Sequence, residues 1–238
     1  MLLRRITQHV QNQNWFAVFI DFLIVVVGVF IGIQVANWNA ERQVNQQRNL
    51  VHQRLVTDFN FLEDFSLQSL ERHKKIIVGL DTLIKAIDRG EVLPEEDEAI
   101  KFALRWGVSY SKKMLRSPTY VELISSGQLN LISDEQLRSA LAIFDQRALD
   151  TEFNFRSIHN VSVKNDSRLL KYGTLQQVNI DNPNIRDVAT YDFTAMLADE
   201  NYYQGLNNCL DIQNWFYSNI EAHNRVLQEI IMTLKGSK

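Results

Sequence analysis

The side chains best able to do chemistry do not form a recognisable metal-binding motif. The histidines are spread along the chain as His9, His52, His73, His159 and His223. None belongs to a His-Glu-x-x-His or Glu-x-x-His pair, which would place two ligands on one face of a helix. His52 and His73 fall on one helical stripe, but at about 1.5 Å per residue they stand about 32 Å apart, too far to share an ion. We therefore expect no metal and no cofactor.

A catalytic nucleophile is equally poorly supported. Cys209 is the single cysteine, so an intrachain disulfide is impossible, and it lies in an apolar helical pattern without a catalytic signature. The sequence has no glycine-rich phosphate loop and no Gly-x-Ser-x-Gly motif. The acidic run Glu95 to Asp97 follows Pro94 and is expected to begin a helix, because acids favour helix N-termini. We expect no enzyme, with a hydrolase that has a deep polar pocket kept as one hypothesis.

The net charge and the scattered basic residues exclude a nucleic-acid partner. The average hydropathy also conceals one strongly apolar segment. The 238 residues carry a formal net charge of -3, and the basic pairs are scattered rather than clustered into a surface that could follow phosphates. The mean hydropathy of the whole chain is -0.19, a value typical of a soluble protein. The oiliest sequence is concentrated near the N-terminus.

That oily run extends from Phe16 to Ala36 and is interrupted only by Asp21 and Gln34. As a helix it is about 32 Å long, close to the hydrocarbon thickness of a bilayer, about 30 Å. A core helix of a soluble protein would show a polar face. A cleaved signal would show a small-x-small site, whereas Gln34 lies two residues before Ala36. The pattern favours an uncleaved membrane span, with a cleaved signal and a buried helix as alternatives.

Residues at the ends of the run suggest how it sits in the membrane. Trp15 and Trp38 flank it, and indole rings prefer the headgroup zone. The preceding tail carries Arg4 and Arg5 without an acid, so the positive-inside rule favours a cytoplasmic N-terminus and an exported C-terminal part. We expect a short basic tail at 1–14, a transmembrane helix at 15–38 and a further domain at 39–238.

Two features of the span share one helical face. Gly28 and Gly32 form a small-xxx-small pattern, which lets two helix backbones approach closely. Asp21 and Val25 fall on the same narrow stripe at about 100° per residue. The simpler interpretation is that Asp21 reaches the headgroups and the glycines are incidental. The alternative is that Asp21 is buried against a partner helix, as a proton-binding or paired charge.

The apolar pattern of the rest of the chain predicts helices that pack against one another. A long apolar stripe continues to Gly90, and short helices follow Pro94 and Ser117-Pro118. A capping box, Ser133 to Gln136, opens another helix that ends near Tyr172-Gly173. Residues 174–191 look irregular, with brief strand character near Val178 and Ile180 as an alternative and a turn at 182–184.

A last helix is expected from Phe193 to Leu234, with Gln213 and Asn224 on its apolar seam, where polar residues often fix helix register. Each helix has one apolar stripe, and these stripes must be buried against one another. The fold class is therefore all-α, with one N-terminal transmembrane helix continuing into a helical-bundle domain with long helices.

Two segments carry a resemblance. Asp21, Gly28 and Gln34, followed by Asn37-Trp38-Asn39 and Glu41-Arg42, resemble the start of a domain-of-unknown-function family of single-span bacterial inner-membrane proteins. Its members have an acid seven residues before the glycine and a Gln-x-x-Asn-Trp-Asn exit. The segment Thr119 to Arg138 is similar to the family's Leu-x-x-Ser-Gly-x-Leu-x-Leu-Ile landmark. This chain has Asp where Glu is usual, and Gly32 is not part of the pattern. The resemblance implies anchoring in a bacterial inner membrane and a helical domain, but no activity.

These observations support a membrane-anchored helical interaction or scaffold protein. Its expected partners are the lipid bilayer and either a second copy of the chain or another membrane protein. A second hypothesis is an ion-coupled subunit of a membrane complex that uses Asp21 as a protonatable group.

Overall fold

The chain consists of long helices that belong to two compact units. The computed structural model describes residues 15–108, 115–177 and 186–236, and their side chains except those of 15, 17–18 and 156–168. It is 83% helical, which confirms the all-α fold class. The two units are Met1–Leu50 and Val51–Lys238. Helix α2 (Trp15–Arg89) runs from the first into the second.

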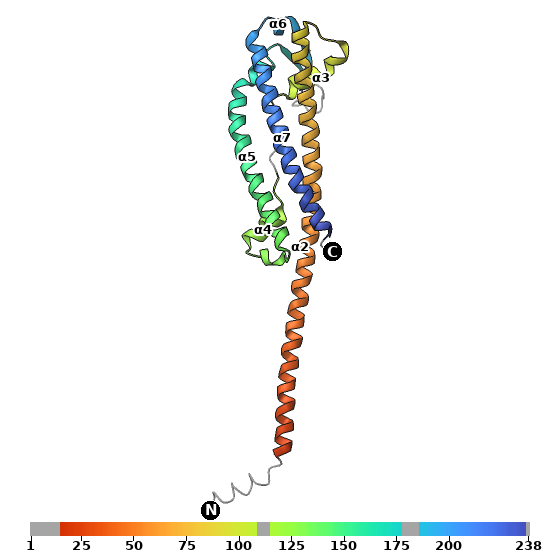
Figure 1. Cartoon of the computed structure of the whole chain (residues 1–238), viewed down its shortest axis with the longest axis vertical. Helices are drawn as coiled ribbons and strands as arrows, with labels where there is room; N and C mark the ends of the chain where they lie inside the picture. Colours follow the sequence, from red (N-terminus) through yellow and green to blue (C-terminus); the bar gives the residue numbers. More distant parts are fainter. Residues whose placement is uncertain (1–14, 109–114, 178–185, 237–238) are drawn as a thin grey trace, which may run out of the picture. The chain divides into compact units, whose positions relative to one another are not determined.

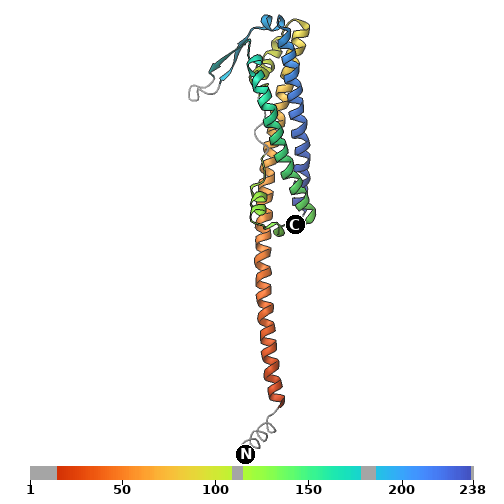
Figure 2. The same ribbon diagram turned by 90° about the vertical axis from the view of Figure 1, so that its left-hand side faces the viewer.

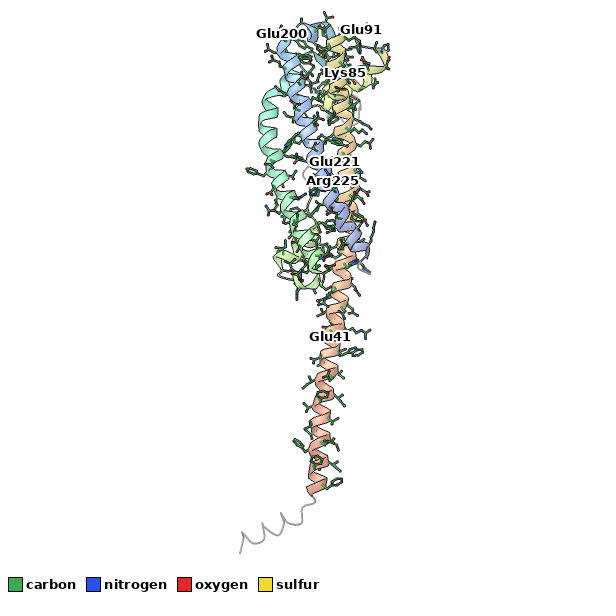
Figure 3. All side chains as sticks on the ribbon, viewed as in Figure 1. Glu41, Lys85, Glu91, Glu200, Glu221 and Arg225 are labelled. Carbon is green, nitrogen blue, oxygen red and sulfur yellow. The ribbon has the colours of Figure 1, made fainter. Side chains whose placement is uncertain are left out.

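In the first unit, the described part of α2 is exposed on all sides. Each described side chain from Phe16 to Leu50 is solvent-exposed. Around Glu41, Figure 3 shows side chains pointing outward on all sides of this helix. The division between the units falls after Leu50, whereas the predicted membrane segment ends at Trp38.

The second unit is built on three long helices that lie side by side. They are the later part of α2, α5 (Glu135–Leu169) and α7 (Glu200–Gly236), as Figures 1 and 2 show. α4 (Pro118–Ser125) packs at the end of the bundle where α7 finishes, and α3 (Asp97–Trp106) and α6 (Phe193–Leu197) lie at the other end. Exposed faces carry i,i+4 ion pairs, such as Arg225 with Glu221 at 3.7 Å, both labelled in Figure 3.

Two large apolar clusters and a smaller one between them hold the bundle together. The cluster at the α4 end joins side chains of α2, α4, α5 and α7: Leu55, Phe59, Leu62, Tyr120, Leu123, Leu141, Phe144, Leu227, Ile230 and Leu234. The cluster at the α3 end joins α2, α3, α6 and α7: Ile76, Leu80, Leu83, Ile100, Leu104, Met196, Tyr202 and Leu206. The apolar stripe of α2 is therefore largely buried from Val51 to Ile84; within it Ile76 is a core residue, and its neighbour Ile77 is half-buried.

Local capping explains where most helices begin and end. α2 ends at Arg89, and Gly90 follows with a φ of 83°, a left-handed conformation that suits glycine. The 3-10 helix η1 (Pro94–Glu96) precedes α3, and the Leu93 backbone N–H donates to Glu96 Oε2 at 2.9 Å. The acidic run therefore includes a helix cap, as predicted. Ser117 Oγ accepts from the Tyr120 N–H at 3.1 Å and begins α4, again as predicted.

The predicted capping box at Ser133 is wrong. After the 3-10 helix η2 (Leu129–Leu131), α5 begins at Glu135, and its cap is Asp134. Asp134 Oδ1 accepts from the Gln136 and Leu137 N–H groups, at 2.8 and 3.1 Å. A carboxylate one residue later competes better than the serine hydroxyl for the free N–H groups of the first turn.

Two further sequence expectations need correction. The irregular stretch contains an antiparallel hairpin of β1 (Gly173–Gln177) and β2 (Arg186–Tyr191), visible beside the bundle in Figure 2. Val178, Ile180 and the turn at 182–184 lie outside the described residues. The last helix is interrupted after α6, because Asp199 Oδ1 accepts from the N–H groups of Asn201 and Tyr202 and begins α7.

Candidate functional site

The apolar part of α2 is the feature most suited to a membrane. In the described part of the chain, one helix is long and apolar enough to cross a bilayer, and its most apolar window is 0% buried. The described large apolar side chains from Phe16 to Val35 are 39–69% exposed. A core helix of a soluble domain would bury these groups against its own chain. The observed exposure therefore disagrees with the buried-helix alternative.

The structure places the four predicted contact residues on one open face of α2. Asp21, Val25, Gly28 and Gly32 are all exposed. At about 100° per residue they occupy an arc of about 60°. A Cβ atom added at either glycine would have no heavy atom within 4 Å. The face is therefore free in a single chain, and its contact with a partner helix stays a prediction.

The predicted interface residues are described unequally. Trp38 is 61% exposed, and the Arg42 guanidinium lies 6.0 Å from the centroid of its ring. Trp15 is the first residue of α2, but its side chain is not among those described. Arg4 and Arg5 lie outside the described residues. The exposed indole and the nearby cation suit a membrane–water boundary at this end of the apolar run.

Within the bundle, α2 and α7 are joined by a buried polar contact. His73 Nδ1 lies 2.6 Å from Gln213 Oε1, and Gln213 Nε2 donates to the Gly107 carbonyl at 2.8 Å. Both side chains are 0% exposed. Because an amide oxygen can only accept, the proton of His73 is on Nδ1. Burial lowers the pKa of His73, since the surrounding apolar groups disfavour the charged ring.

Two further buried polar side chains lie next to each other along α7, towards its C-terminal end. The ring of His223 packs on Phe144 with centroids 4.4 Å apart, and its neighbour Asn224 is 7% exposed. Burial lowers the pKa of His223 to about 4. Among the described residues, four buried side-chain atoms have no hydrogen-bond partner: Ser66 Oγ, His73 Nε2, His223 Nδ1 and Asn224 Oδ1. Because these atoms are buried without a partner, they lower the stability of the bundle.

Sequence reasoning found part of this interior. It identified Gln213 and Asn224 as seam residues, and both are buried. His73 was considered only as a possible metal ligand and rejected. The heptad spacing of Phe59, Ser66, His73 and Leu80 could have shown that His73 lies in the core. Among the described residues, no group of three or more His, Cys, Asp or Glu side chains is arranged to hold a metal ion.

No protein-family model, curated protein or solved structure matches this chain. The family resemblance therefore depends on two segments of the sequence. The first lies on the exposed part of α2. The second, Thr119 to Arg138, covers α4, η2 and the first turn of α5.

Proposed function

We propose that this protein is a membrane-anchored helical interaction or scaffold protein. It spans a bacterial inner membrane once, as in the family that it resembles, and the basic residues Arg4 and Arg5 favour a cytoplasmic N-terminus with the bundle in the periplasm. It acts by self-association or by contact with another membrane protein through the stripe of Asp21, Val25, Gly28 and Gly32.

The observation that carries this proposal is the exposure of the apolar part of α2. Removing one large apolar side chain from water contributes about 1.5–3 kcal/mol, and many such side chains of residues 16–35 are uncovered. The bundle has apolar clusters of its own and none of them includes this segment. A lipid phase removes the whole circumference of a helix from water at once, which a single protein groove does not.

Membrane retention is tested by alkaline carbonate extraction of native membranes, with the mass of the mature chain measured in parallel. The full chain should remain in the pellet. A double variant, Val26→Arg with Phe30→Arg, should be released, because each central arginine costs about 2.5–3.5 kcal/mol in a span. A wild-type chain that is released, or that begins after Ala36, would contradict the proposal.

Helix contact is tested by oxidative crosslinking in membranes, with Cys209→Ser as background. Cysteines at Gly28 or Gly32 should trap a dimer or a partner, and their side chains have free space in the single chain. Phe30→Cys is the matched control, since position 30 lies at a similar depth on the opposite face, about 180° from Asp21. Equal crosslinking at positions 28, 30 and 32, or monomer in all three, would refute a specific contact face.

A second function, an ion-coupled subunit, is favoured by one observation. Asp21 is an exposed carboxylate on an otherwise apolar stretch of helix. A carboxylate at that place needs water, a headgroup or a partner. Asp21→Glu should retain the function of the assembled complex, and Asp21→Asn should abolish it. If both variants function equally, protonation of Asp21 is not involved.

A further inference from the structure

The segment of α2 that follows the predicted span, residues 39–50, has one uncharged side. Asn39, Gln43, Gln46 and Leu50 are all exposed and, at about 100° per residue, fall within an arc of about 60°. We call these four residues the stalk face. Leu50 is 60% exposed, so an uncovered apolar side chain ends a row of three amides. The stalk face is therefore an open helix surface without a charge of its own.

The charged residues of this segment lie away from the stalk face. Glu41 and Arg48 are about 160° and 180° from Asn39 around the helix. Arg42 lies at the edge, about 60° from Asn39, and its guanidinium is 6.0 Å from the centroid of the Trp38 ring. Water alone does not favour uncharged side chains on one side of a helix, whereas contact with another helix does. This distribution of charge is therefore typical of a helix with a helical partner.

The stalk face continues the contact stripe proposed within the membrane. Gly28 and Gly32 each lie about 20° from Asn39 around the helix. From Val25 to Leu50 the residues on this line recur every 3.6 residues, on average about one per turn. Because this is the period of a straight α-helix, a single partner helix can follow the line from the span to the end of the stalk face.

The side chains of the stalk face identify the partner. Copies of a single-span protein have the same orientation in a membrane, so two of them pair in parallel about a two-fold axis, and a residue near that axis meets its own copy. A charge repels its own copy, whereas an amide has both donor and acceptor groups and pairs with the same amide. Leu50 of each copy likewise covers Leu50 of the other.

We propose that the stalk face binds the stalk face of a second copy of this chain, in parallel. The inference rests on the proposed membrane span and names the partner of its contact stripe. Polar residues in a helix contact fix register and pairing at a cost in affinity. The stalk contact therefore depends on the membrane to hold the two copies side by side.

The position of the contact is tested by disulfide formation in native membranes, with Cys209→Ser as background. Gln46→Cys should give a disulfide-linked dimer, because a disulfide requires Cα atoms within about 7 Å of each other. Val44→Cys is the matched control, since it is exposed two residues away but points about 160° from Gln46. Equal crosslinking at both positions, or monomer at position 46, would overturn the proposal.

The identity of the partner is tested by charge exchange between two differently tagged full-length chains. When both chains carry Gln46→Lys, or both carry Gln46→Glu, mutual capture in mild detergent should fall about tenfold, because like charges then face each other. One chain with Gln46→Lys and one with Gln46→Glu should restore capture, and only a second copy can supply this compensating charge. The same three combinations at Val44 are the control and should be captured equally. Equal capture of all three combinations at position 46 would show that the stalk face does not meet its own copy.

Failure of this inference is distinguishable from failure of the proposed function. A dimer trapped through Gly28→Cys but not through Gln46→Cys would overturn the stalk contact and leave the contact within the span. A Gln46→Cys chain crosslinked to a different protein would overturn the second copy as partner. A chain released by alkaline carbonate would contradict the membrane span itself, and this inference with it.

Discussion

Helix α2 has two regions with the same backbone conformation and opposite surfaces. From Phe16 to Leu50 each described side chain is exposed, whereas from Val51 to Arg89 one face is buried by α3, α4, α5 and α7. From Phe16 to Ala36 apolar residues surround the helix, whereas from Val51 to Arg89 they form a stripe. The distribution of apolar residues, and not helix formation, therefore differs between the part of α2 that the bundle covers and the part that it leaves exposed.

The glycines of α2 also differ between its two regions. Gly28 and Gly32 have no neighbour for an added Cβ, but a Cβ at Gly79 would collide with the Ala99 carbonyl and lie 2.7 Å from Ala103 Cβ. Glycine inside a helix costs about 1 kcal/mol relative to alanine. At Gly79, however, α3 lies so close to α2 that a larger side chain has no room. A glycine of α2 therefore serves packing in the bundle region and leaves an open face in the apolar region.

The largest effect is expected from the buried amide between α2 and α7. Gln213→Ala removes the partners of His73 Nδ1 and of the Gly107 carbonyl. At about 1–3 kcal/mol for each buried unpaired group, the free energy of unfolding should fall by about 4 kcal/mol. Urea unfolding followed by circular dichroism in mild detergent measures it. Gln204→Ala, on the exposed side of α7, is the control, and an equally small effect of both would show that the bundle does not depend on this contact.

Acid should weaken the bundle region and spare the helicity of the apolar region. Burial lowers the pKa of His223 from 6.5 to about 4. Below pH 6.5 the His223 ring is protonated in the unfolded chain, whereas in the folded chain it stays neutral down to about pH 4. The stabilisation is therefore complete above pH 6.5 and decreases by about 3 kcal/mol as the pH falls to 4.

The pH effect is measured by urea unfolding between pH 7.5 and 4. His223→Gln should flatten the profile, because it removes one titrating ring, and buried His73 contributes in the same direction. A wild-type profile that is already flat in this range would mean that neither histidine is buried in its neutral form.

A smaller loss is expected at Gly79. Gly79→Ala forces α2 away from α3, and overpacking of this kind costs about 1–3 kcal/mol. Gly205→Ala is the matched control in α7, where the methyl group has free space; it should be neutral or stabilise by up to about 1 kcal/mol. Thermal unfolding of both variants measures the difference. If Gly79→Ala lowers thermal stability no more than Gly205→Ala does, α2 and α3 do not approach as closely as described at Gly79.

Loss of a helix cap should cost less again. Asp134→Ala removes the acceptor of two N–H groups at the start of α5 and should cost about 1 kcal/mol, whereas Ser133→Ala should change stability by less than about 0.5 kcal/mol. The reverse order would restore the capping box that the sequence predicted.

The smallest effect on folding is expected in the apolar region. Gly28→Ala should leave the unfolding of the bundle unchanged within about 0.5 kcal/mol, because the added methyl group meets nothing in the single chain. In membranes, the bulkier Gly28→Ile should reduce crosslinking through a Gly32→Cys thiol. A Gly28→Ala variant that unfolds more easily would show that this face packs within its own chain.

Features that depend on local pattern could be predicted from the sequence alone. Its apolar run and stripes predicted the long helix that ends before Gly90, and Pro94, Ser117 and the acidic run predicted two helix starts. Each of these follows from the spacing of apolar residues or from a cap within a few residues, so neighbours along the chain are sufficient to decide it.

The partners that these local elements contact depend instead on packing between segments far apart in the sequence. The contact of His73 with Gln213 joins residues far apart in sequence, and the role of Gly79 depends on the backbone of α3. The hairpin of β1 and β2 and the break before α7 also depend on how segments pack. Burial and hydrogen bonding between distant segments are properties of the folded arrangement, and no local pattern contains them.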